Sequence, residues 1–248
     1  MRILLLGGTA EARDLSRQIA AAGHGLITSL AGVTDRPAPQ GGALRQGGFG
    51  GADGLATFLR TERITHLIDA THPFAVRMKS NAIAAALATG CPILRVLRPA
   101  WPTAPEWRLV PDLAAAAAAL PRGARVFLST GRNSLQHFAG RDDVEFHARV
   151  IDDRPGPFPL ARGGFLIGRP PFSVEEEAAT LRAHRIDVLV SRNSGGTGGI
   201  EKLLAARTLG LDIVMVERPA IDGVDQNDRP EPVAETVAEA LAWLNAAR

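Results

Sequence analysis

The residues best suited to chemistry follow short apolar runs, where a strand gives way to a helix. The first such place is Gly7-Gly8-Thr9-Ala10-Glu11, directly after the apolar run Ile3–Leu6. Glycines let a ligand approach the backbone, and the N–H groups at the start of a helix attract phosphate. The segment departs from the GxGxxG fingerprint, so its motif alone indicates an anion site rather than a particular nucleotide. We expect these five residues to hold a cofactor pyrophosphate, with the Thr9 hydroxyl as a donor.

A second group with chemical potential is Asp69-Ala70-Thr71-His72-Pro73, at the end of another apolar run. Loops at the carboxyl ends of parallel strands carry the ligands in open α/β sheets. His72 is the one histidine of six in such a position, and histidine exchanges protons near neutral pH. We predict His72 and Asp69 as candidate proton donors, and Ala70, Thr71 and Pro73 as cofactor contacts. A purely structural role for His72 stays open.

The end of the run Gly25–Leu30 bears on the choice of nucleotide. Ser29, with Arg36 a little further on, can receive a ribose 2′-phosphate, and no acidic residue follows directly to repel one. The pattern favours NADPH over NADH.

Two loops in the second half of the chain are also rich in polar residues. Ser129–Ser134 contains hydroxyl groups and Arg132, although a simple helix cap has the same composition. Ser191–Gly199 has four glycines, and Lys202 follows one turn later. This second loop is typical of an anion-binding nest. It is not a Walker A motif, because no Lys-Ser/Thr pair follows its last glycine.

Strand-length apolar runs alternate with helical stretches, as in a parallel sheet covered by helices. The predicted strands are Arg2–Leu6, Gly25–Leu30, His66–Asp69, Ile93–Leu97, Arg125–Ser129, Val144–Ala148, Val188–Ser191 and Ile213–Glu217. The predicted helices are Ala10–Ala22, Gly51–Glu62, Ala75–Ala88, Leu113–Leu120, Ser134–Phe138, Val174–His184, Gly199–Leu209 and Val233–Asn245.

Three landmarks recur in the same order along the chain, beginning at residues 2 and 125, 63 and 185, and 93 and 213. Nearly constant offsets indicate two similar units. A proline-rich stretch at Arg98–Pro111 separates them. We therefore predict an α/β protein of two similar Rossmann-like domains with parallel sheets, residues 1–100 and 101–248, and a cleft between them. Asp152–Ser173, rich in proline and glycine, is either a stiff surface loop or a closing lid.

Composition narrows the classes of function. The chain has 248 residues and a formal net charge of +2, which does not indicate nucleic-acid binding driven by bulk electrostatics. No window approaches the roughly 18 apolar residues of a membrane span, and Gly7-Gly8 interrupt the first apolar run too early for a signal peptide. The single cysteine, Cys91, excludes an internal disulfide and a multi-thiolate metal site. We expect a cytoplasmic protein.

Taken together, the motifs resemble one family. Gly7-Gly-Thr-x-Glu-Ala-Arg13, Asp69-Ala-Thr-His-Pro-Phe-Ala75, Ser129-Thr-Gly-Arg132 and Ser191-Arg-Asn-Ser-Gly-Gly-x-Gly-Gly199 occur in this order in precorrin-6A reductases, and Arg218-Pro219 also fits. The resemblance implies NADPH-dependent reduction of the precorrin-6A macrocycle to precorrin-6B in cobalamin biosynthesis. It implies no metal and no flavin. Transient contact with neighbouring enzymes of the pathway is also expected.

The implied substrate carries many carboxylates, which arginine and lysine bind well. We expect the first domain to bind NADPH and the second to bind the tetrapyrrole, although the reverse assignment stays open. The residues predicted to contact substrate are Arg13, Arg77, Lys79, Thr130, Gly131, Arg132, Arg192, Asn193, Ser194, Gly195, Gly196 and Lys202. Two other functions are alternatives: a cofactor-independent lyase of the uroporphyrinogen-III synthase type, and a non-catalytic tetrapyrrole carrier.

Overall fold

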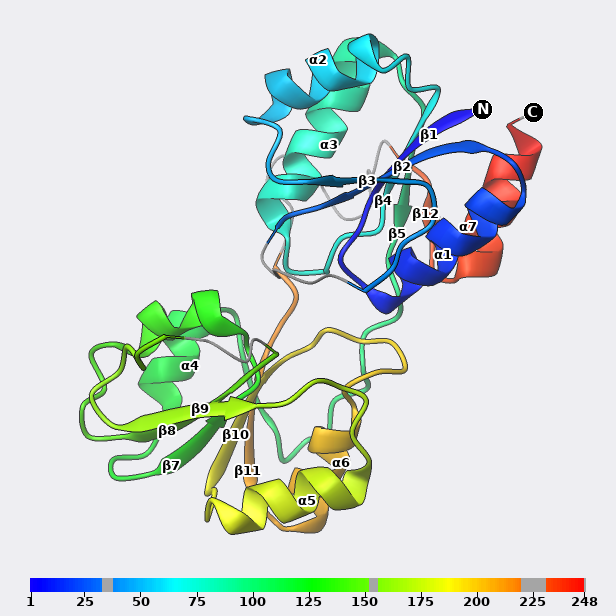
Figure 1. The fold of residues 1–248 in the computed structure, drawn as a ribbon. Coiled ribbons are helices and arrows are strands. Elements are labelled where there is room, and N and C mark those ends of the chain that lie inside the picture. The colour runs from blue at the N-terminus through cyan, green and yellow to red at the C-terminus, as the bar shows by residue number, and fades with distance from the viewer. Residues whose placement is uncertain (33–37, 152–155, 220–230, 248) are drawn as a thin grey trace. The chain divides into compact units, whose positions relative to one another are not determined.

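Two separate parallel sheets organise the chain in the computed structural model, which describes residues 1–32, 38–151, 156–219 and 231–247 (Figure 1). The first unit comprises Met1–Pro99 together with the described part of the C-terminal segment, and the second comprises Ala100–Pro219. Among the described residues, no helix is long and apolar enough to cross a membrane.

The sheet of the first unit has six parallel strands in the order β12-β5-β4-β1-β2-β3. These strands are β1 (Arg2–Leu6), β2 (Gly25–Leu30), β3 (Ala43–Gln46), β4 (His66–Asp69), β5 (Ile93–Val96) and β12 (Val233–Ala234). Along the chain the strand order reverses between β1 and β4. This is the order of dinucleotide-binding Rossmann folds, and the reversal is where such folds bind their ligands.

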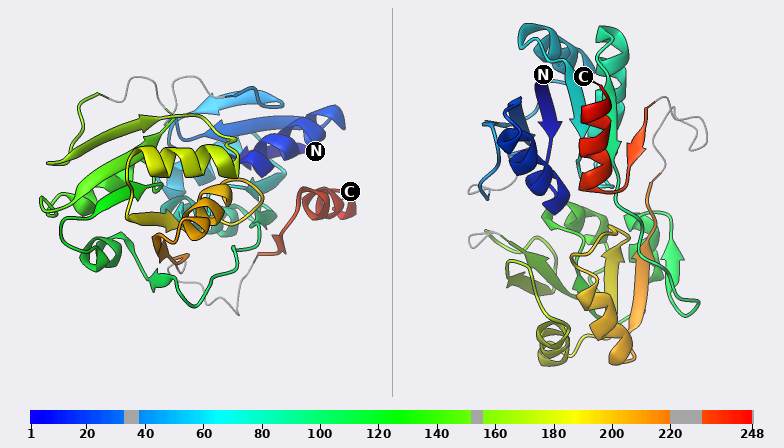
Figure 2. Two further views of the ribbon diagram at one scale, coloured as in Figure 1. Left: turned by 90° about the horizontal axis from the view of Figure 1, so that it is seen from below. Right: turned by 90° about the vertical axis from the view of Figure 1, so that its right-hand side faces the viewer.

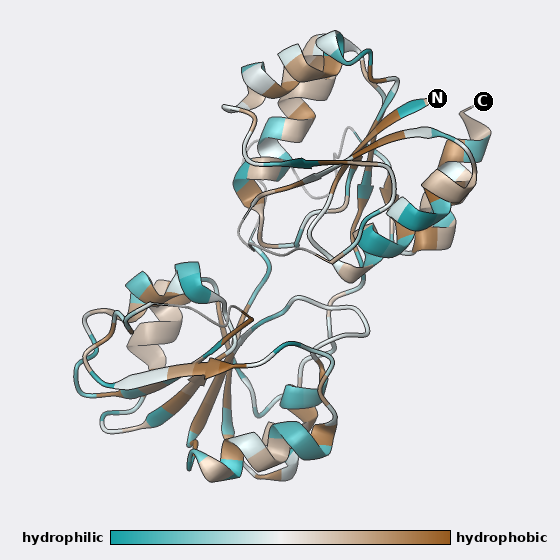
Figure 3. Cartoon of the chain, viewed as in Figure 1, coloured by the Kyte–Doolittle hydropathy of each residue, from teal (hydrophilic) through white to brown (hydrophobic). Residues whose placement is uncertain are grey.

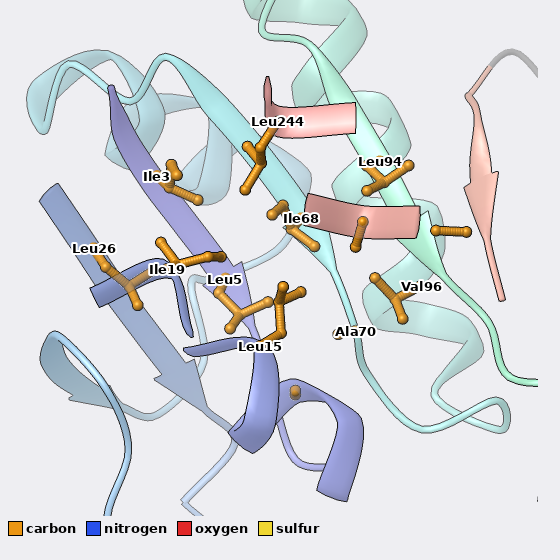
Figure 4. Close-up of a cluster of buried hydrophobic side chains, with 13 residues drawn as sticks. Ile3, Leu5, Leu15, Ile19, Leu26, Ile68, Ala70, Leu94, Val96 and Leu244 are labelled. Atoms are coloured by element: carbon orange, nitrogen blue, oxygen red, sulfur yellow. The ribbon is translucent and has the colours of Figure 1, made fainter. Parts of the chain in front are cut away.

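Helices cover both faces of this sheet. The helices α1 (Ala10–Ala21) and α7 (Val237–Ala246) cover one face, and α2 (Ala52–Thr61) and α3 (Val76–Thr89) cover the other. β1 is buried on both sides because Ile3 and Leu5 point toward α1 and α7, whereas Leu4 and Leu6 point toward α2 and α3. Such continuous apolar runs are typical of central parallel strands. Figure 4 shows the first of these clusters, the one with Ile3 and Leu5. In Figure 3 the central strands are largely hydrophobic (brown), whereas the helices that cover them carry hydrophilic (teal) bands.

The second unit repeats this plan. Its strands are β6 (Arg108–Val110), β7 (Arg125–Leu128), β8 (Glu145–Val150), β9 (Gly163–Ile167), β10 (Val188–Arg192) and β11 (Asp212–Val216), in the order β6-β11-β10-β7-β8-β9. Its helices are α4 (Leu113–Ala119), the 3-10 helix η1 (Arg132–Phe138), α5 (Val174–Ala183) and α6 (Glu201–Thr208). The helices α5 and α6 share one apolar cluster with the sheet. The prediction of two similar Rossmann-like units with parallel sheets is confirmed.

The outermost strands are exchanged between the two repeats. β6 follows β5 along the chain but pairs with β11, and β12 follows β11 but pairs with β5. An equivalent helix follows each exchanged strand: α4 follows β6, and α7 follows β12. Asp112 caps the N-terminus of α4, and Thr236 caps that of α7 in the same way. Each sheet is therefore completed by a segment that the sequence places after the other repeat.

The predicted boundary of the second domain at residue 248 is consequently wrong for residues 231–247. The carbonyls of Pro232, just before β12, and of Ala234 in β12 accept the backbone N–H groups of Arg95 and Leu97 at 3.0 and 2.8 Å. Glu231 forms a salt bridge with Arg95, and both side chains are only 1% exposed. α7, drawn in red, lies with the elements of the first unit in each view of Figure 2. This segment extends the first sheet and covers its face, so it belongs to the first unit.

Most predicted elements are found within a few residues of their expected bounds. The expected helix Val233–Asn245 begins only at Val237, after the short strand β12. The strands β3, β6 and β9 were not predicted. They are short edge strands whose residues, apart from Val110, are exposed or half-buried, so they lack the fully buried apolar run that marks a central strand.

Candidate functional site

A cavity of about 850 Å³ opens at the carboxyl ends of the strands of the first unit. The loops after β1, β2, β3 and β4 and the first turns of α3 contribute its walls. Its lining includes Gly7, Gly8, Ser29, Leu30, Ala31, Gly32, Gln46, Gly47, Gly48, Phe49, Gly50, Gly51, Thr71, His72, Ala75, Arg77, Met78 and Asn81. The cavity thus lies at the reversal of strand order, where a Rossmann fold binds its nucleotide.

The two glycines of the loop after β1 disfavour other residues, each for its own reason. Gly8 has φ +121°, which disfavours other residues, and a Cβ on Gly7 would lie 3.2 Å from Leu30 Cδ2. Both glycines line the cavity. Backbone at the cavity wall is therefore within reach of a ligand, and the phosphate cradle stays a prediction.

Thr9 has a different role from the one expected. Its Oγ1 accepts the N–H of Ala12 at 3.1 Å, which caps α1, and its hydroxyl donates to the carbonyl of Ala70 at 3.0 Å. Thr9 therefore joins the loop after β1 to the loop after β4. Its hydroxyl proton goes to the protein, so the predicted donation of that proton to phosphate is not what the structure supports.

Two more predicted cofactor contacts are engaged inside the protein. Glu11 Oε2 lies 2.7 Å from Arg98 Nη1, in a partly buried salt bridge that fixes the first turn of α1 to the end of β5. Ala70 is 2% exposed and belongs to the hydrophobic core. Ala10 begins α1, and Pro73 lies beside a small neighbouring hollow with Thr9 and Glu11. Arg36 falls outside the described residues.

Asp69, Thr71 and Lys79 form a buried polar group behind the cavity wall. The Asp69 carboxylate accepts the backbone N–H and the hydroxyl of Thr71 at 3.0 and 2.6 Å. The Lys79 ammonium lies 3.4 Å from Asp69 Oδ2 and 3.2 Å from Thr71 Oγ1. Asp69 and Lys79 are each 1% exposed. Lys79 is thus committed to Asp69 rather than presented to a substrate, and Asp69 is withdrawn from the cavity.

His72, in contrast, lines the cavity. Its Nδ1 accepts the backbone N–H of Phe74 at 3.3 Å. A nitrogen that accepts carries no proton, so this contact places the proton of the neutral ring on Nε2. Arg77 and Asn81 line the same cavity from α3, with Arg77 exposed. The structure therefore brings Arg77 to the first unit's cavity, and Arg13 lies exposed on α1.

One wall of the cavity was not predicted from the sequence. Residues 46–51, after β3, include Gly47, Gly48, Gly50 and Gly51 around Phe49. Gly54 in α2 lets the helix approach this loop, because a Cβ there would lie 1.7 Å from the carbonyl oxygen of Phe49. The density of glycines in this stretch is the signal that could have revealed it.

In the second unit, the loop after β7 lies beside the cationic side chain of Arg192 on β10. A Cβ on Gly131, whose φ is +84°, would lie 3.3 Å from Arg192 Nη2. Arg132 is exposed, and its guanidinium lies 6.0 Å from the ring centre of Phe165. Burial lowers the pKa of Arg192. Thr130, however, is 1% exposed and bonded to Ser134 at 2.6 Å, so it stabilises the loop from inside.

The glycine-rich loop Ser191–Gly199 is fixed by donors to its carbonyl oxygens. Trp101 Nε1 donates to Gly196 at 2.7 Å, and Arg218 donates to Asn193 and Ser194 at 3.0 and 3.2 Å. The Asn193 amide is bonded on both sides to the backbone of Trp101, at 2.8 and 3.1 Å. Asn193 is therefore a structural residue rather than the expected substrate contact.

The N–H groups of this loop have the opposite character. Gly195, Gly196 and Gly199 have positive φ values of 65°, 76° and 86°. The backbone N–H groups of residues 195–198 donate to no described residue. A loop with its carbonyls engaged and successive N–H groups available is suited to bind an anion.

Lys202 is close to this loop. Its ammonium donates to the carbonyl of Gly199 and lies 5.1 Å from the ring centre of Trp101. Burial is the main cause that lowers the pKa of Lys202 to about 8, against the opposing effect of Glu177 and Glu201. Lys202 thus helps to hold the loop and leaves a positive charge beneath it at neutral pH.

The fold and these loops define a chain of two Rossmann-type units, one with a glycine-lined cavity at its switch point and the other with an anion-binding loop. Its sequence matches the family described as precorrin-6x reductase CbiJ/CobK over residues 2–245. The chain belongs to this reductase family.

Individual relatives agree with this assignment. The chain is 40% identical to a precorrin-6A reductase of Rhodobacter capsulatus over 246 residues, covering 98% of this chain and 95% of the relative. It is 30% identical to a cobalt-precorrin-6A reductase of Priestia megaterium, covering 89% of this chain and 91% of the relative. A solved structure titled CobK precorrin-6A reductase superposes with a TM-score of 0.90 at 39% identity, covering 99% of this chain and 96% of that one.

Proposed function

We propose that this chain reduces precorrin-6A to precorrin-6B in cobalamin biosynthesis, with hydride from NADPH bound in the first unit. The observation that carries the proposal is the glycine-lined cavity at the switch point of that unit, in a chain that belongs to a reductase family. Identity is 40% to a relative named for metal-free precorrin-6A and 30% to one named for the cobalt form, which favours the metal-free substrate.

The residues of the cavity fit a dinucleotide. Gly8 offers its backbone to a pyrophosphate at the start of α1, beside Gly7, whose N–H donates to the Ser29 carbonyl at 2.9 Å. Ser29 lies near the end of β2, where the adenosine ribose lies in such folds. Thr71 and His72 line the cavity at the end of β4. When bound, the nicotinamide supplies the hydride, and the protein contributes binding, orientation and charge.

His72 is the proposed proton donor to the ring carbon next to the one that receives the hydride. In this role the ring acts as the imidazolium, which gives one proton to carbon and becomes the neutral imidazole. Proton transfer by a positioned side chain contributes about 10²–10⁴-fold to rate. Asp69 acts as a positioning residue: it binds Thr71 through two hydrogen bonds and so fixes the residue next to His72.

The second unit is the proposed binding site for the carboxylates of the tetrapyrrole. Arg132 and Arg192 adjoin Gly131, and the N–H groups of residues 195–198 are available for an anion. Charge-assisted hydrogen bonds of this kind are about twice as strong as neutral ones. The proposed contacts retained from the sequence analysis are Gly131, Arg132, Arg192, Ser194, Gly195 and Gly196.

The central experiment follows absorbance at 340 nm after addition of precorrin-6A to protein and NADPH, together with NADP⁺ titration of the free protein. We expect one NADPH oxidised per macrocycle. The variant Gly8→Ala should weaken NADP⁺ binding at least about tenfold, because its methyl would strain a backbone at φ +121° at the cavity wall. Gly140→Ala is the matched control, since nothing lies within 4 Å of its added Cβ.

Three results would contradict the proposal. Conversion of the macrocycle without NADPH oxidation would indicate a lyase, and binding without conversion would indicate a carrier. Crystals soaked with NADP⁺ that place it on Ser191–Gly199 would reverse the assignment of the two units.

A further inference from the structure

Arg45 on β3 lies at the edge of the nucleotide cavity, in register with Ser29 on β2. Its Nη1 donates to Ser29 Oγ at 3.3 Å and to the carbonyl of Gly47 at 2.6 Å. Its Nη2 donates to the carbonyl of Gly48 at 2.7 Å. All three partners line the cavity. The Arg45 guanidinium is thus held against the wall formed by the ends of β2 and β3.

The charge of Arg45 has no carboxylate partner among the described residues. No Asp or Glu of the described chain lies within 4.0 Å of its guanidinium, and residues 38–51 contain neither residue type. The group lies 3.8 Å from the ring centre of Phe49, and burial lowers its pKa. Its Nε–H and one Nη2–H donate to no described acceptor. A half-buried guanidinium with unused N–H groups beside a cavity wall can add charge-assisted hydrogen bonds to an anion.

The position of Arg45 identifies the kind of anion. In Rossmann units the adenosine ribose lies at the end of the second strand. There an acidic residue binds the free ribose hydroxyls of NADH, whereas a nearby arginine accommodates the 2′-phosphate of NADPH. Here the end of β2 provides Ser29, and the adjacent residue on β3 is Arg45.

We propose that Arg45, together with the Ser29 hydroxyl, binds the ribose 2′-phosphate and thereby selects NADPH over NADH. The inference rests on the proposed function, which places the nucleotide in the first unit. Arg45 was not among the residues predicted from the sequence. The arginine expected in this role, Arg36, lies outside the described residues.

The test compares two ligands that differ only in the 2′-phosphate, adenosine 2′,5′-bisphosphate and adenosine 5′-monophosphate. Calorimetric titration of the full chain should show a preference for the bisphosphate of at least about tenfold. In Arg45→Gln that preference should fall by about 10- to 100-fold, because a charge-assisted contact is lost. Affinity for the monophosphate should stay unchanged. Arg60→Gln, an exposed arginine on α2 of the same unit, is the matched control.

The possible outcomes separate this inference from the proposed function. If Arg45→Gln weakens both ligands equally, Arg45 only braces Gly47 and Gly48, and the inference fails while the proposed function stands. If the unaltered chain binds neither ligand and NADPH is not oxidised, the proposed function fails as well. Arg45→Lys keeps the charge and should retain part of the preference, which provides a second variant should Arg45→Gln fold poorly.

Discussion

At the scale of single residues, the charged side chains buried deepest are held in opposite-charge pairs. Lys79 with Asp69, and Arg95 with Glu231, are each 1% exposed. Burying such a pair gives little net stability, but removing one member leaves a charge without compensation. Asp69 also fixes Thr71, next to His72 at the cavity. The first pair therefore connects stability of the first unit to geometry at the proposed proton donor.

The variant Lys79→Met is expected to lower the free energy of unfolding by about 3–5 kcal/mol at pH 7, because Asp69 keeps its buried charge without the ammonium. Urea unfolding measures this change. The double variant Asp69→Asn with Lys79→Met should recover part of the loss. Arg17→Gln, an exposed side chain on α1, should change the free energy by no more than about 0.5 kcal/mol. A loss in Lys79→Met no larger than in Arg17→Gln would contradict the expectation.

At the scale of elements, the segment β12–α7 completes a sheet that the sequence begins more than two hundred residues earlier. Leu244 and Ala240 of α7 pack with Ile68 of β4 and Leu94 of β5 in one buried cluster. The segment also covers β5, which would otherwise be an exposed edge strand. The first unit is accordingly discontinuous in sequence, whereas the second is continuous.

Leu244→Ala should destabilise the first unit by about 2–5 kcal/mol, because it opens a cavity at a side chain that is 1% exposed. Hydrogen exchange should show the loss of protection in α1, β4 and β5 and leave the second unit unchanged. Leu87→Ala, 70% exposed on α3, is the control with the same chemical change. Loss of protection in β10 and β11 instead would show that α7 belongs with the second unit.

At the scale of the whole molecule, the two units repeat one fold but differ in their loops. The first has a glycine-lined cavity, and the second has Arg132, Arg192 and a braced glycine loop. Duplication thus supplies two strand-end sites, and differences in the loops allow two different ligands. This is the physical basis for assigning nucleotide and tetrapyrrole to separate units.

Arg132→Gln is expected to raise KM for precorrin-6A about tenfold, since one charge-assisted contact of about 1.5 kcal/mol is lost. The Kd for NADPH should not change, because Arg132 lies in the other unit. Steady-state kinetics and nucleotide titration measure the two quantities. Arg122→Gln, 91% exposed before β7, should alter neither. An altered Kd for NADPH with an unchanged KM for precorrin-6A would instead assign the nucleotide to the second unit.

Much of the site could be predicted from the sequence because strand-end loops carry their own signals. Glycines at Gly7 and Gly8, and a histidine directly after a strand, reveal themselves by type and spacing. The roles of Thr9, Asp69, Lys79 and Asn193 could not be predicted in this way. Each of these polar side chains bonds a group of the protein itself, and sequence spacing does not show whether a polar side chain faces a ligand or a neighbouring loop.

The sequence by itself determined the fold class, the repeat and the family, because apolar periodicity and recurring motifs are local properties of the chain. Only the tertiary structure decided which segments complete each sheet, and it brought Arg45 beside Ser29 at the cavity wall. Strand pairing joins residues that are distant in sequence. Edge strands such as β3 and β12 have too little apolar periodicity for their pairing to be predicted from the sequence.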